Sequence, residues 1–286
     1  MKKYIEYWTL LIFFFLFKLL GLKISSFLGG IMFLAYGKFS KRNKIVKKNL
    51  SKVFPDLTLN KKNKIIKDMW FHFGRVIGEY PNLNKLRIGK DNEISIENES
   101  NLLNPLKQYP NCLFFSAHIG NWELTSHLLT KNGFKIHFIY RAPNNELVDN
   151  LLKKIRIGYG VGLIKKGNEG AKQCLKILNK DGGHIGMLID QKMNDGIETN
   201  FFNQKVMSPS AIAKFSLKYK CPIIPAVCIR EKSTNFRISY LEPLTPSKLK
   251  TIGNETEIMN HLNRIVEEWV RLNPEQWIWF HNRWND

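Results

Sequence analysis

The sequence predicts an α/β protein, in which a mixed central sheet is flanked by helices and preceded by an N-terminal membrane-anchor helix. The chain has 286 residues, of which 44% are hydrophobic and 24% charged, a balance typical of a globular protein. Short apolar runs alternate with helical patterns along most of its length, as in α/β domains. One long apolar segment with a single charge precedes them.

That apolar segment, Tyr7–Leu22, reads YWTLLIFFFLFKLLGL, and a second apolar stretch follows at Phe27–Tyr36. A helix needs about 20 apolar residues to cross a bilayer, and the one charge, Lys18, has a side chain long enough to reach the interface. An uncleaved anchor is favoured over a secretory signal peptide, because no small-residue cleavage site is followed by a neutral or acidic start. We therefore expect an anchor at residues 1–37 and one catalytic domain at residues 38–286.

A basic strip follows the anchor directly. Lys38–Lys52 contains seven basic residues and no acidic one, within a chain that has 44 Lys and Arg against 24 Asp and Glu. Next to an apolar segment, such a strip favours contact with anionic membrane phospholipid, with a solvated helix face as the alternative. Nucleic acid is not an expected partner, because the sequence has no Gly-rich phosphate loop, zinc-ligand spacing or RNA-binding aromatic motif. The positive-inside rule and four cysteines without a CxxC pair both indicate a cytoplasmic domain.

The remaining elements follow from periodicity and from prolines. Helices are expected at Lys44–Phe54 and Asn60–Glu79, because apolar residues recur at helical spacing and Pro55 and Pro81 follow them. The runs predicted as strands are Cys112–Ala117, Lys135–Tyr140, Val161–Ile164, His184–Ile189, Ile223–Ile229 and Phe236–Leu241. Further helices are predicted at Asn121–Lys131, Glu146–Ile157, Glu169–Asn179, Ser208–Tyr219 and Glu255–Leu272. This alternation predicts a sheet that helices largely cover.

Reactive side chains gather where the first of these strands ends. His118 follows the apolar run CLFFSA, and Glu123 comes five positions later in a helix that we expect Asn121 to cap and Gly133 to end. A bend between strand and helix can bring the two side chains together. The carboxylate would then accept the proton of one imidazole nitrogen and leave the other nitrogen as a base. We interpret the pair as two members of a triad, with a substrate hydroxyl in the place of serine.

Other candidate groups are weaker. The pair His281 and Asp286 has the same spacing, but it lies at the end of the chain and we interpret it as coincidence. Cys112 begins the same strand as His118 and is an alternative nucleophile, although we expect it to be buried. No metal site is predicted. The other histidines are interpreted as surface or satisfied interior groups: His72, His127, His137, His184 and His261.

Several blocks resemble a known family. The block FFSAHIGNWE is similar to the His-x4-acid block of the bacterial late acyltransferases of lipid A biosynthesis, the lauroyl/myristoyl transferase family. The resemblance covers nearly the whole chain, because further blocks occur in the family's order: RNKIVKKNLSKVFPDLT, FGRVIGEY, YRAPNN, GHIGMLIDQ and NPEQWIWFHNRW. Six blocks in one order are a specific signal.

The resemblance implies an activity and a location. It implies transfer of a fatty acyl chain from acyl carrier protein to a hydroxyl of a hydroxyacyl chain on a lipid A precursor of the Kdo-lipid IVA type. It also implies a fold like that of the glycerolphosphate acyltransferases, a place at the cytoplasmic face of the bacterial inner membrane, and no cofactor apart from the acyl carrier protein co-substrate. The alternative activity is a glycerophosphate-type or other glycolipid acyltransferase with the same dyad. A structural membrane adaptor would need no dyad.

The same resemblance implies roles for individual residues. His118 and Glu123 match the catalytic dyad, Arg156 matches the downstream basic residue, and Asp190 matches the acid of the third block. Arg141 lies in the YRAPNN block, where Ala142 departs from the family's commonest tripeptide. We expect Arg141, Arg156 and Asp190 to serve substrate binding. The two guanidinium groups can bind phosphate or carboxylate groups bidentately, with a solvated helix face as the alternative for Arg156. Asp190 follows an apolar strand and could orient Arg156 or the dyad, with a plain turn residue as its alternative. Tyr140 and Gln191 are further candidates nearby.

Two questions stay open at this stage. Negative charge on the thioester oxygen could be stabilised by backbone N–H groups around Gly120–Asn121 or by an arginine. The aromatic cluster near the C-terminus could pack in the core or lie at the interface beside the acyl path. Its residues are Pro274, Trp277, Trp279, Phe280 and Trp284.

Overall fold

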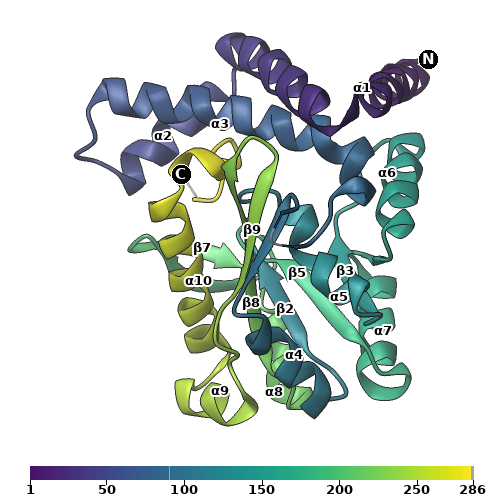
Figure 1. Ribbon diagram of the computed structural model, residues 1–286. Helices are drawn as coiled ribbons and strands as arrows, with labels where there is room; N and C mark the ends of the chain where they lie inside the picture. Colours follow the sequence, from purple (N-terminus) through teal and green to yellow (C-terminus); the bar gives the residue numbers. More distant parts are fainter. Residues whose placement is uncertain (90, 285–286) are drawn as a thin grey trace.

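A computed structural model describes residues 1–89 and 91–284, and it confirms the predicted α/β class with a mostly parallel central sheet (Figure 1). The sheet has seven strands in the order β1-β9-β8-β2-β5-β3-β4. Neighbouring strands are parallel except β8 and β9, which are antiparallel. The strands are β1 (Ile94–Glu97), β2 (Leu113–Ser116), β3 (Ile136–Tyr140), β4 (Gly162–Lys165), β5 (His184–Leu188), β8 (Ile223–Lys232) and β9 (Asn235–Tyr240).

All six predicted strands are present, and within residues 1–89 and 91–284 there are three further strands that were not predicted. β1 has the sequence ISIE and only four residues, too short for a periodic signal. β6 (Ile197–Phe201) and β7 (Gln204–Ser208) form a separate antiparallel hairpin. Their sequences, IETNF and QKVMS, are half polar, because the hairpin lies outside the central sheet.

Helices cover both faces of the sheet and create two apolar cores. Leu113 and Phe115 of β2 belong to one core, while Cys112 and Phe114 belong to the other, as expected for a strand that alternates its side chains between two faces. All four side chains are at most 3% exposed. The covering elements are α4 (Glu99–Gln108), α5 (His127–Lys131), α6 (Glu146–Gly158), α7 (Asn168–Lys176), η3 (Ile177–Asp181), α8 (Ala211–Tyr219), α9 (Pro246–Ile252) and α10 (Glu255–Leu272).

The N-terminal helices lie across one end of the sheet (Figure 1). They are α1 (Lys2–Phe39), α2 (Asn43–Val53), α3 (Leu59–Glu79) and the 3-10 turn η1 (Tyr80–Lys85). α1 bends sharply at Gly21, whose φ of 75° is in the left-handed region that glycine tolerates. By length and composition alone, α1 is apolar and long enough to cross a membrane.

The C-terminal aromatic cluster is core packing. After α10 and the 3-10 turn η4 (Pro274–Gln276), Trp277, Trp279 and Trp284 are each at most 1% exposed. They belong to the same core as Leu113 and Phe115 of β2. Phe280 differs, because it is partly exposed and stacks on Trp70 of α3 with ring centroids 5.1 Å apart. The cluster therefore joins the end of the chain to the N-terminal helices.

Candidate active site

His118 lies in the loop directly after β2, and Asp190 lies two residues after the neighbouring parallel strand β5. Because parallel strands end at the same edge of a sheet, this pairing brings two residues 72 positions apart together. His118 Nδ1 is 2.8 Å from Asp190 Oδ1, and the backbone N–H of His118 donates to Asp190 Oδ2 over 2.9 Å. The imidazole is thus held at two points by one carboxylate.

Asp190 is buried, with 1% of its surface exposed, and it accepts a further hydrogen bond from Trp277 Nε1 over 2.8 Å. Burial alone would raise its pKa, but His118 and the donors that surround the carboxylate lower the pKa to about 2. An ionised Asp190 fixes the proton of His118 on Nδ1. In the neutral ring with this tautomer, Nε2 of His118 carries no proton and can act as a base.

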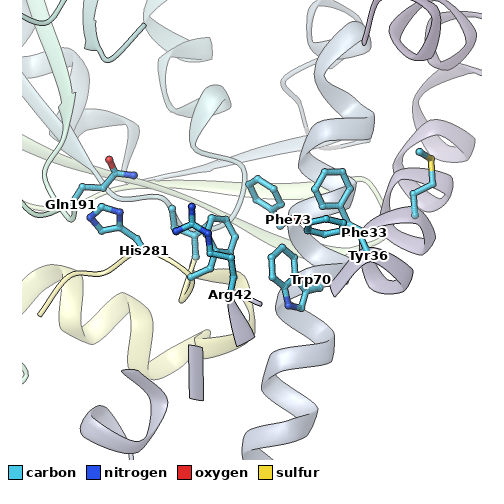
Figure 2. Close-up of a pocket in the computed structure, with 10 residues that line it drawn as sticks. Phe33, Tyr36, Arg42, Trp70, Phe73, Gln191 and His281 are labelled. Carbon is cyan, nitrogen blue, oxygen red and sulfur yellow. The ribbon is translucent and has the colours of Figure 1, made fainter. Parts of the chain in front are cut away.

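His118 Nε2 accepts a long hydrogen bond from the side-chain amide of Gln191, whose Nε2 is 3.4 Å away. Gln191 also lines an open pocket of about 660 Å³ between the domain and the N-terminal helices. Figure 2 shows Gln191 and His281 at one end of the pocket, Arg42 near its middle, and aromatic rings from α1 and α3 at the other end. The lining residues are Met32, Phe33, Tyr36, Arg42, Trp70, Phe73, Gln191, Ile278, Phe280 and His281. An apolar pocket with a polar end suits a ligand with a long hydrocarbon chain.

His281 is a pocket residue that the sequence analysis set aside. Its Nε2 accepts a hydrogen bond from the backbone N–H of Lys192 over 3.0 Å. Burial lowers its pKa to about 4, so the ring is neutral at pH 7. The spacing partner considered for it, Asp286, lies outside the described residues. Only the position of His281 beside Gln191 distinguishes it, and no sequence pattern carries that information.

Glu123 has a different partner from the one predicted. It lies in the 3-10 turn η2 (Trp122–Ser126). Arg156 of α6 binds its carboxylate bidentately: Nε donates to Oε2 over 2.9 Å and Nη2 donates to Oε1 over 2.5 Å. Tyr159 donates to Oε2 over 3.1 Å and Trp122 Nε1 to Oε1 over 3.2 Å. Burial alone would raise the pKa of Glu123, but Arg156 and these donors hold it below its ordinary value.

The predicted direct brace between Glu123 and His118 is therefore corrected, because the carboxylate that bonds the imidazole is Asp190. The reason is the turn after His118: Gly120 adopts a φ of 57°, and a methyl group there would overlap the carbonyl of Cys228. The chain then enters η2 with Glu123 directed at α6. Trp122 connects the two groups, because its ring is 5.2 Å from the ring of His118 and its Nε1 donates to Glu123.

The basic residues expected near the substrate occupy different surroundings. The guanidinium of Arg156 lies 5.7 Å from the centre of the Tyr80 ring and 5.8 Å from the centre of the Tyr140 ring. Its N–H groups form an ion pair with Glu123. Although burial opposes its charge, Glu123 raises the pKa of Arg156. Arg141 is exposed, immediately after β3. Arg156 is therefore occupied by an internal ion pair, whereas Arg141 is exposed to solvent.

The backbone donors proposed for the thioester oxygen are already engaged. The N–H of Gly120 donates to the carbonyl of Gln276 over 3.1 Å, and that of Asn121 donates to the carbonyl of Cys228 over 3.2 Å. Asn121 makes no side-chain cap either, since its Nδ2 donates to Glu79 Oε2 over 2.9 Å. Of the two alternatives left open by the sequence, the backbone one is therefore disfavoured for these two N–H groups, because they hold the loop in place.

A buried polar network behind the loop was not predicted. Glu79 of α3 is paired bidentately with Arg230 of β8, over 2.6 Å and 2.8 Å, and both side chains are at most 5% exposed. His72 Nε2 donates to the carbonyl of Gly120 over 3.0 Å, while Nδ1 accepts from Arg230. Burial and then the charge of Arg230 lower the pKa of His72 to about 3. A glutamate inside the apolar FGRVIGEY block was the one sequence signal for this network.

The cysteines are not organised for nucleophilic attack. Cys112 is fully buried, and burial raises the pKa of its thiol to about 12, so the thiolate is not formed at pH 7. Among residues 1–89 and 91–284, no group of three or more His, Cys, Asp or Glu side chains is arranged to hold a metal ion.

Comparison with known proteins gives the family. The family model described as bacterial lipid A biosynthesis acyltransferase matches residues 1–286, the whole chain. A comparison with curated proteins found no match. The family match agrees with the order of the sequence blocks and with a histidine and a carboxylate beside an apolar pocket. The chain belongs to the bacterial lipid A biosynthesis acyltransferases.

Proposed function

We propose that this protein transfers a fatty acyl chain from acyl carrier protein to a hydroxyl of a hydroxyacyl chain on a lipid A precursor of the Kdo-lipid IVA type. We place the reaction at the cytoplasmic face of the bacterial inner membrane. Family membership supports an acyltransferase of lipid A biosynthesis. One observation carries the proposal further: His118 is braced by a buried carboxylate on Nδ1, and its Nε2 faces Gln191 at one end of an apolar pocket.

The proposed step is a direct acyl transfer. Nε2 of His118 takes the proton of the acceptor hydroxyl while the hydroxyl oxygen attacks the thioester carbonyl. The new C–O bond forms, the C–S bond breaks, and the imidazolium returns its proton to the departing thiolate. Asp190 stabilises the imidazolium, as the aspartate of a serine-hydrolase triad does. No covalent acyl-enzyme is needed, because the acceptor supplies its own nucleophile.

Gln191 is the donor we propose for the thioester oxygen. Its side-chain amide contacts the base over 3.4 Å, so a thioester carbonyl that displaces this contact and lies beside both groups could accept a hydrogen bond from the amide as charge develops. The backbone N–H groups of Gly120 and Asn121 are engaged elsewhere. Side-chain amides serve this purpose in other acyl-transfer enzymes.

Glu123 is proposed as a positioning residue, and Arg156 is proposed to act through it. Glu123 accepts a hydrogen bond from Trp122 Nε1, and the Trp122 ring lies against the ring of His118. The carboxylate therefore fixes the position of the indole that packs against the base. Arg156 in turn holds Glu123 ionised. In this proposal His118 and Glu123 are thus linked indirectly, through the indole of Trp122. Arg141, which is exposed, is proposed to bind an anionic group of either substrate.

The test supplies purified protein with acyl carrier proteins that bear different chains and with a lipid A precursor, and follows the product by mass. We expect the acceptor to gain one acyl chain and lose no phosphate. A parallel reaction with acyl coenzyme A in place of acyl carrier protein shows which of the two thioesters the protein uses as acyl donor. Acylation of lysophosphatidate but not of the lipid A precursor would favour the glycerophosphate-type alternative.

The control for this assay is His118→Ala, purified in the same way and checked for folding by circular dichroism. General-base catalysis contributes about 10²–10⁴-fold, so kcat should fall by that factor. A folded His118→Ala protein that keeps full turnover would contradict the mechanism. A protein that is folded and transfers no chain to any acceptor would contradict the enzyme itself and favour an adaptor.

A further inference from the structure

Exposed apolar side chains are concentrated on α1. Among the described residues, the large hydrophobic side chains that are exposed belong to residues 1–39, with four exceptions: Leu59, Ile157, Leu217 and Leu272. On α1 they include Trp8 at 56%, Phe15 at 60% and Phe27 at 57% exposed, on both sides of the bend at Gly21. Scattered apolar residues need no explanation, but a continuous surface of this kind requires a covering partner.

The first arm of α1, before Gly21, is attached to the domain at both of its ends. Near the N-terminus, Asn145 Nδ2 donates to the carbonyl of Lys3 over 2.8 Å and to Glu6 Oε2 over 3.0 Å. Asn145 is also the residue that caps α6. Near the bend, Asn82 Nδ2 of η1 donates to the carbonyl of Phe17 over 3.0 Å.

The second arm of α1, after Gly21, packs along α3. Ser26 donates to Glu79 Oε1 over 2.6 Å, within the network behind the His118 loop. Methyl groups at Gly29 or Gly78 would overlap the backbone of the facing helix, so the two helices touch directly. At the far end, Trp70 lies against Gly37. Both arms therefore contact the domain: the first near its two ends and the second along α3, and Figure 1 shows them as two separate helical segments.

We propose that α1 lies flat in one leaflet of the membrane and does not cross the bilayer. A spanning first arm of 19 residues would carry Lys3 about 28 Å from the bend, at 1.5 Å per residue, and across the hydrocarbon core. Asn145 could not then reach Lys3, because Asn145 belongs to the domain that carries His118. The bend at Gly21 lets both arms follow the surface of the domain while their outer faces stay apolar.

Charge identifies an anionic phospholipid leaflet as the partner. α1 carries five lysines and one glutamate, and Lys41, Arg42, Lys44, Lys47 and Lys48 follow in the next nine residues. Apolar residues that insert among acyl chains, with basic residues at the level of the headgroups, are typical of interfacial helices. Met32, Phe33 and Tyr36 of the second arm also line the pocket. If the proposed function holds, a lipid acceptor could then enter sideways from the leaflet.

The test compares the sides from which two introduced cysteines react. Lys2→Cys marks the start of α1 and Lys107→Cys marks the end of α4; both positions are exposed and outside the site. The full chain is expressed in a Gram-negative host, and intact spheroplasts are treated with a membrane-impermeant maleimide before and after lysis. The wild-type chain is the control, because its four cysteines are at most 2% exposed.

We expect both cysteines to be protected in intact spheroplasts, to react after lysis, and to remain with the membrane fraction. Reaction of Lys2→Cys in intact spheroplasts while Lys107→Cys is protected would show a spanning arm and overturn the proposal. Protein that leaves the membrane fraction as a soluble dimer would show that a second copy covers α1, and would also overturn it. Acyl transfer is measured separately, so failure here is distinguishable from failure of the proposed reaction.

A depth measurement gives a second, independent result. Fluorophores on Ile12→Cys and Ile24→Cys, both exposed, report depth through lipids brominated at different acyl carbons. In a flat α1 both labels should be quenched best by the same shallow lipid, about 5–10 Å below the headgroups. A deep Ile12 label beside a shallow Ile24 label would overturn the proposal, because a spanning first arm places residue 12 near the bilayer centre.

Discussion

At the scale of single residues, the site depends on which carboxylate pairs with which nitrogen donor. Asp190 binds the imidazole of His118, and Glu123 binds the guanidinium of Arg156. Both carboxylates are buried, and each has a lowered pKa for the same reason: donors that favour the charged form outweigh the cost of burial. The two pairs are adjacent, because Trp122 touches both. The Asp190–His118 pair and the Glu123–Arg156 pair lead to different experimental predictions.

Asp190→Asn should lower kcat by about 10²–10⁴-fold while the protein stays folded. An amide can donate to His118 Nδ1 and so favour the wrong tautomer, as it does in the serine-hydrolase triad. The matched control is Asp195→Asn, an exposed acid five residues later that should keep full activity. Kinetics with saturating acyl donor measure the effect, and near-normal kcat in the Asp190 variant would contradict the assigned brace.

Gln191→Ala should lower kcat by about 10²–10³-fold, the usual loss when one oxyanion donor is removed. The loss should appear in kcat more than in KM, because the hydrogen bond strengthens only as charge develops. Gln108→Ala, an exposed glutamine at the end of α4, serves as the control. An effect confined to KM would instead assign Gln191 to ground-state binding.

Glu123→Leu and Arg156→Met should each lower the free energy of unfolding, by about 2–4 kcal/mol, because each leaves a charge without its partner in the protein interior. The value is at the low end for buried pairs, since 19% of the Arg156 side chain is exposed. The double variant should recover much of this loss. Urea unfolding of the four proteins measures the coupling, and strictly additive losses would contradict an energetically coupled pair.

At the scale of elements, α1 and α3 are joined by small residues. Gly74 and Gly78 are spaced by four positions, so they lie on one face of α3, and that face meets Ser25 and Gly29 of α1. Such a face allows two backbones to approach closely, which is typical of helix pairs in membranes. The sequence predicted both helices, but their contact depends on which faces meet.

Gly78→Ala should destabilise the protein by about 1–3 kcal/mol, because the added methyl group overlaps the carbonyl of Ser25 and forces the helices apart. Gly158→Ala is the matched control, since nothing lies within 4 Å of a methyl group there. In a helix that change should be neutral or stabilising by up to about 1 kcal/mol. Urea unfolding in the same detergent compares the two, and equal stability would contradict the close contact.

At the scale of the whole molecule, the site forms at the edge of the sheet where β2 and β5 end, under the layer of N-terminal helices (Figure 1). Crevices at the carboxyl ends of parallel strands are the usual ligand sites of α/β folds. Histidines that are buried around this framework should make global stability depend on pH. Burial is the main cause that lowers the pKa of His72 to about 3 and that of His184 to about 4.

The free energy of unfolding should therefore fall as the pH falls below about 6.5. In that range the unfolded chain takes up protons that neutral His72, His184 and His281 in the folded protein do not. The expected loss is about 2 kcal/mol for each histidine between pH 7.5 and pH 5. Urea titrations across this range measure it. His184→Asn, whose oxygen can still accept from the Cys112 N–H, should remove about a third of the slope, because His184 is one of three histidines with a strongly lowered pKa. A slope that the variant leaves unchanged would contradict the assignment.

The sequence by itself determined the elements with strong periodicity, namely the α/β class, six of the seven strands of the central sheet and the apolar first helix. It also located His118, because an apolar strand followed by a polar turn is a local pattern. Local spacing is sufficient for such features, since each depends on neighbours within one or two turns.

Only the tertiary structure decided which side chains interact with each other in the site and around it. Whether His118 meets Glu123, five positions away, or Asp190, 72 positions away, depends on the pairing of β2 with β5. The same applies to Glu79 and Arg230, which are 151 positions apart. The attachment of Lys3 to Asn145 was equally hidden. A buried charge takes whichever counter-charge the fold places beside it, because burial without a partner is costly at any sequence separation.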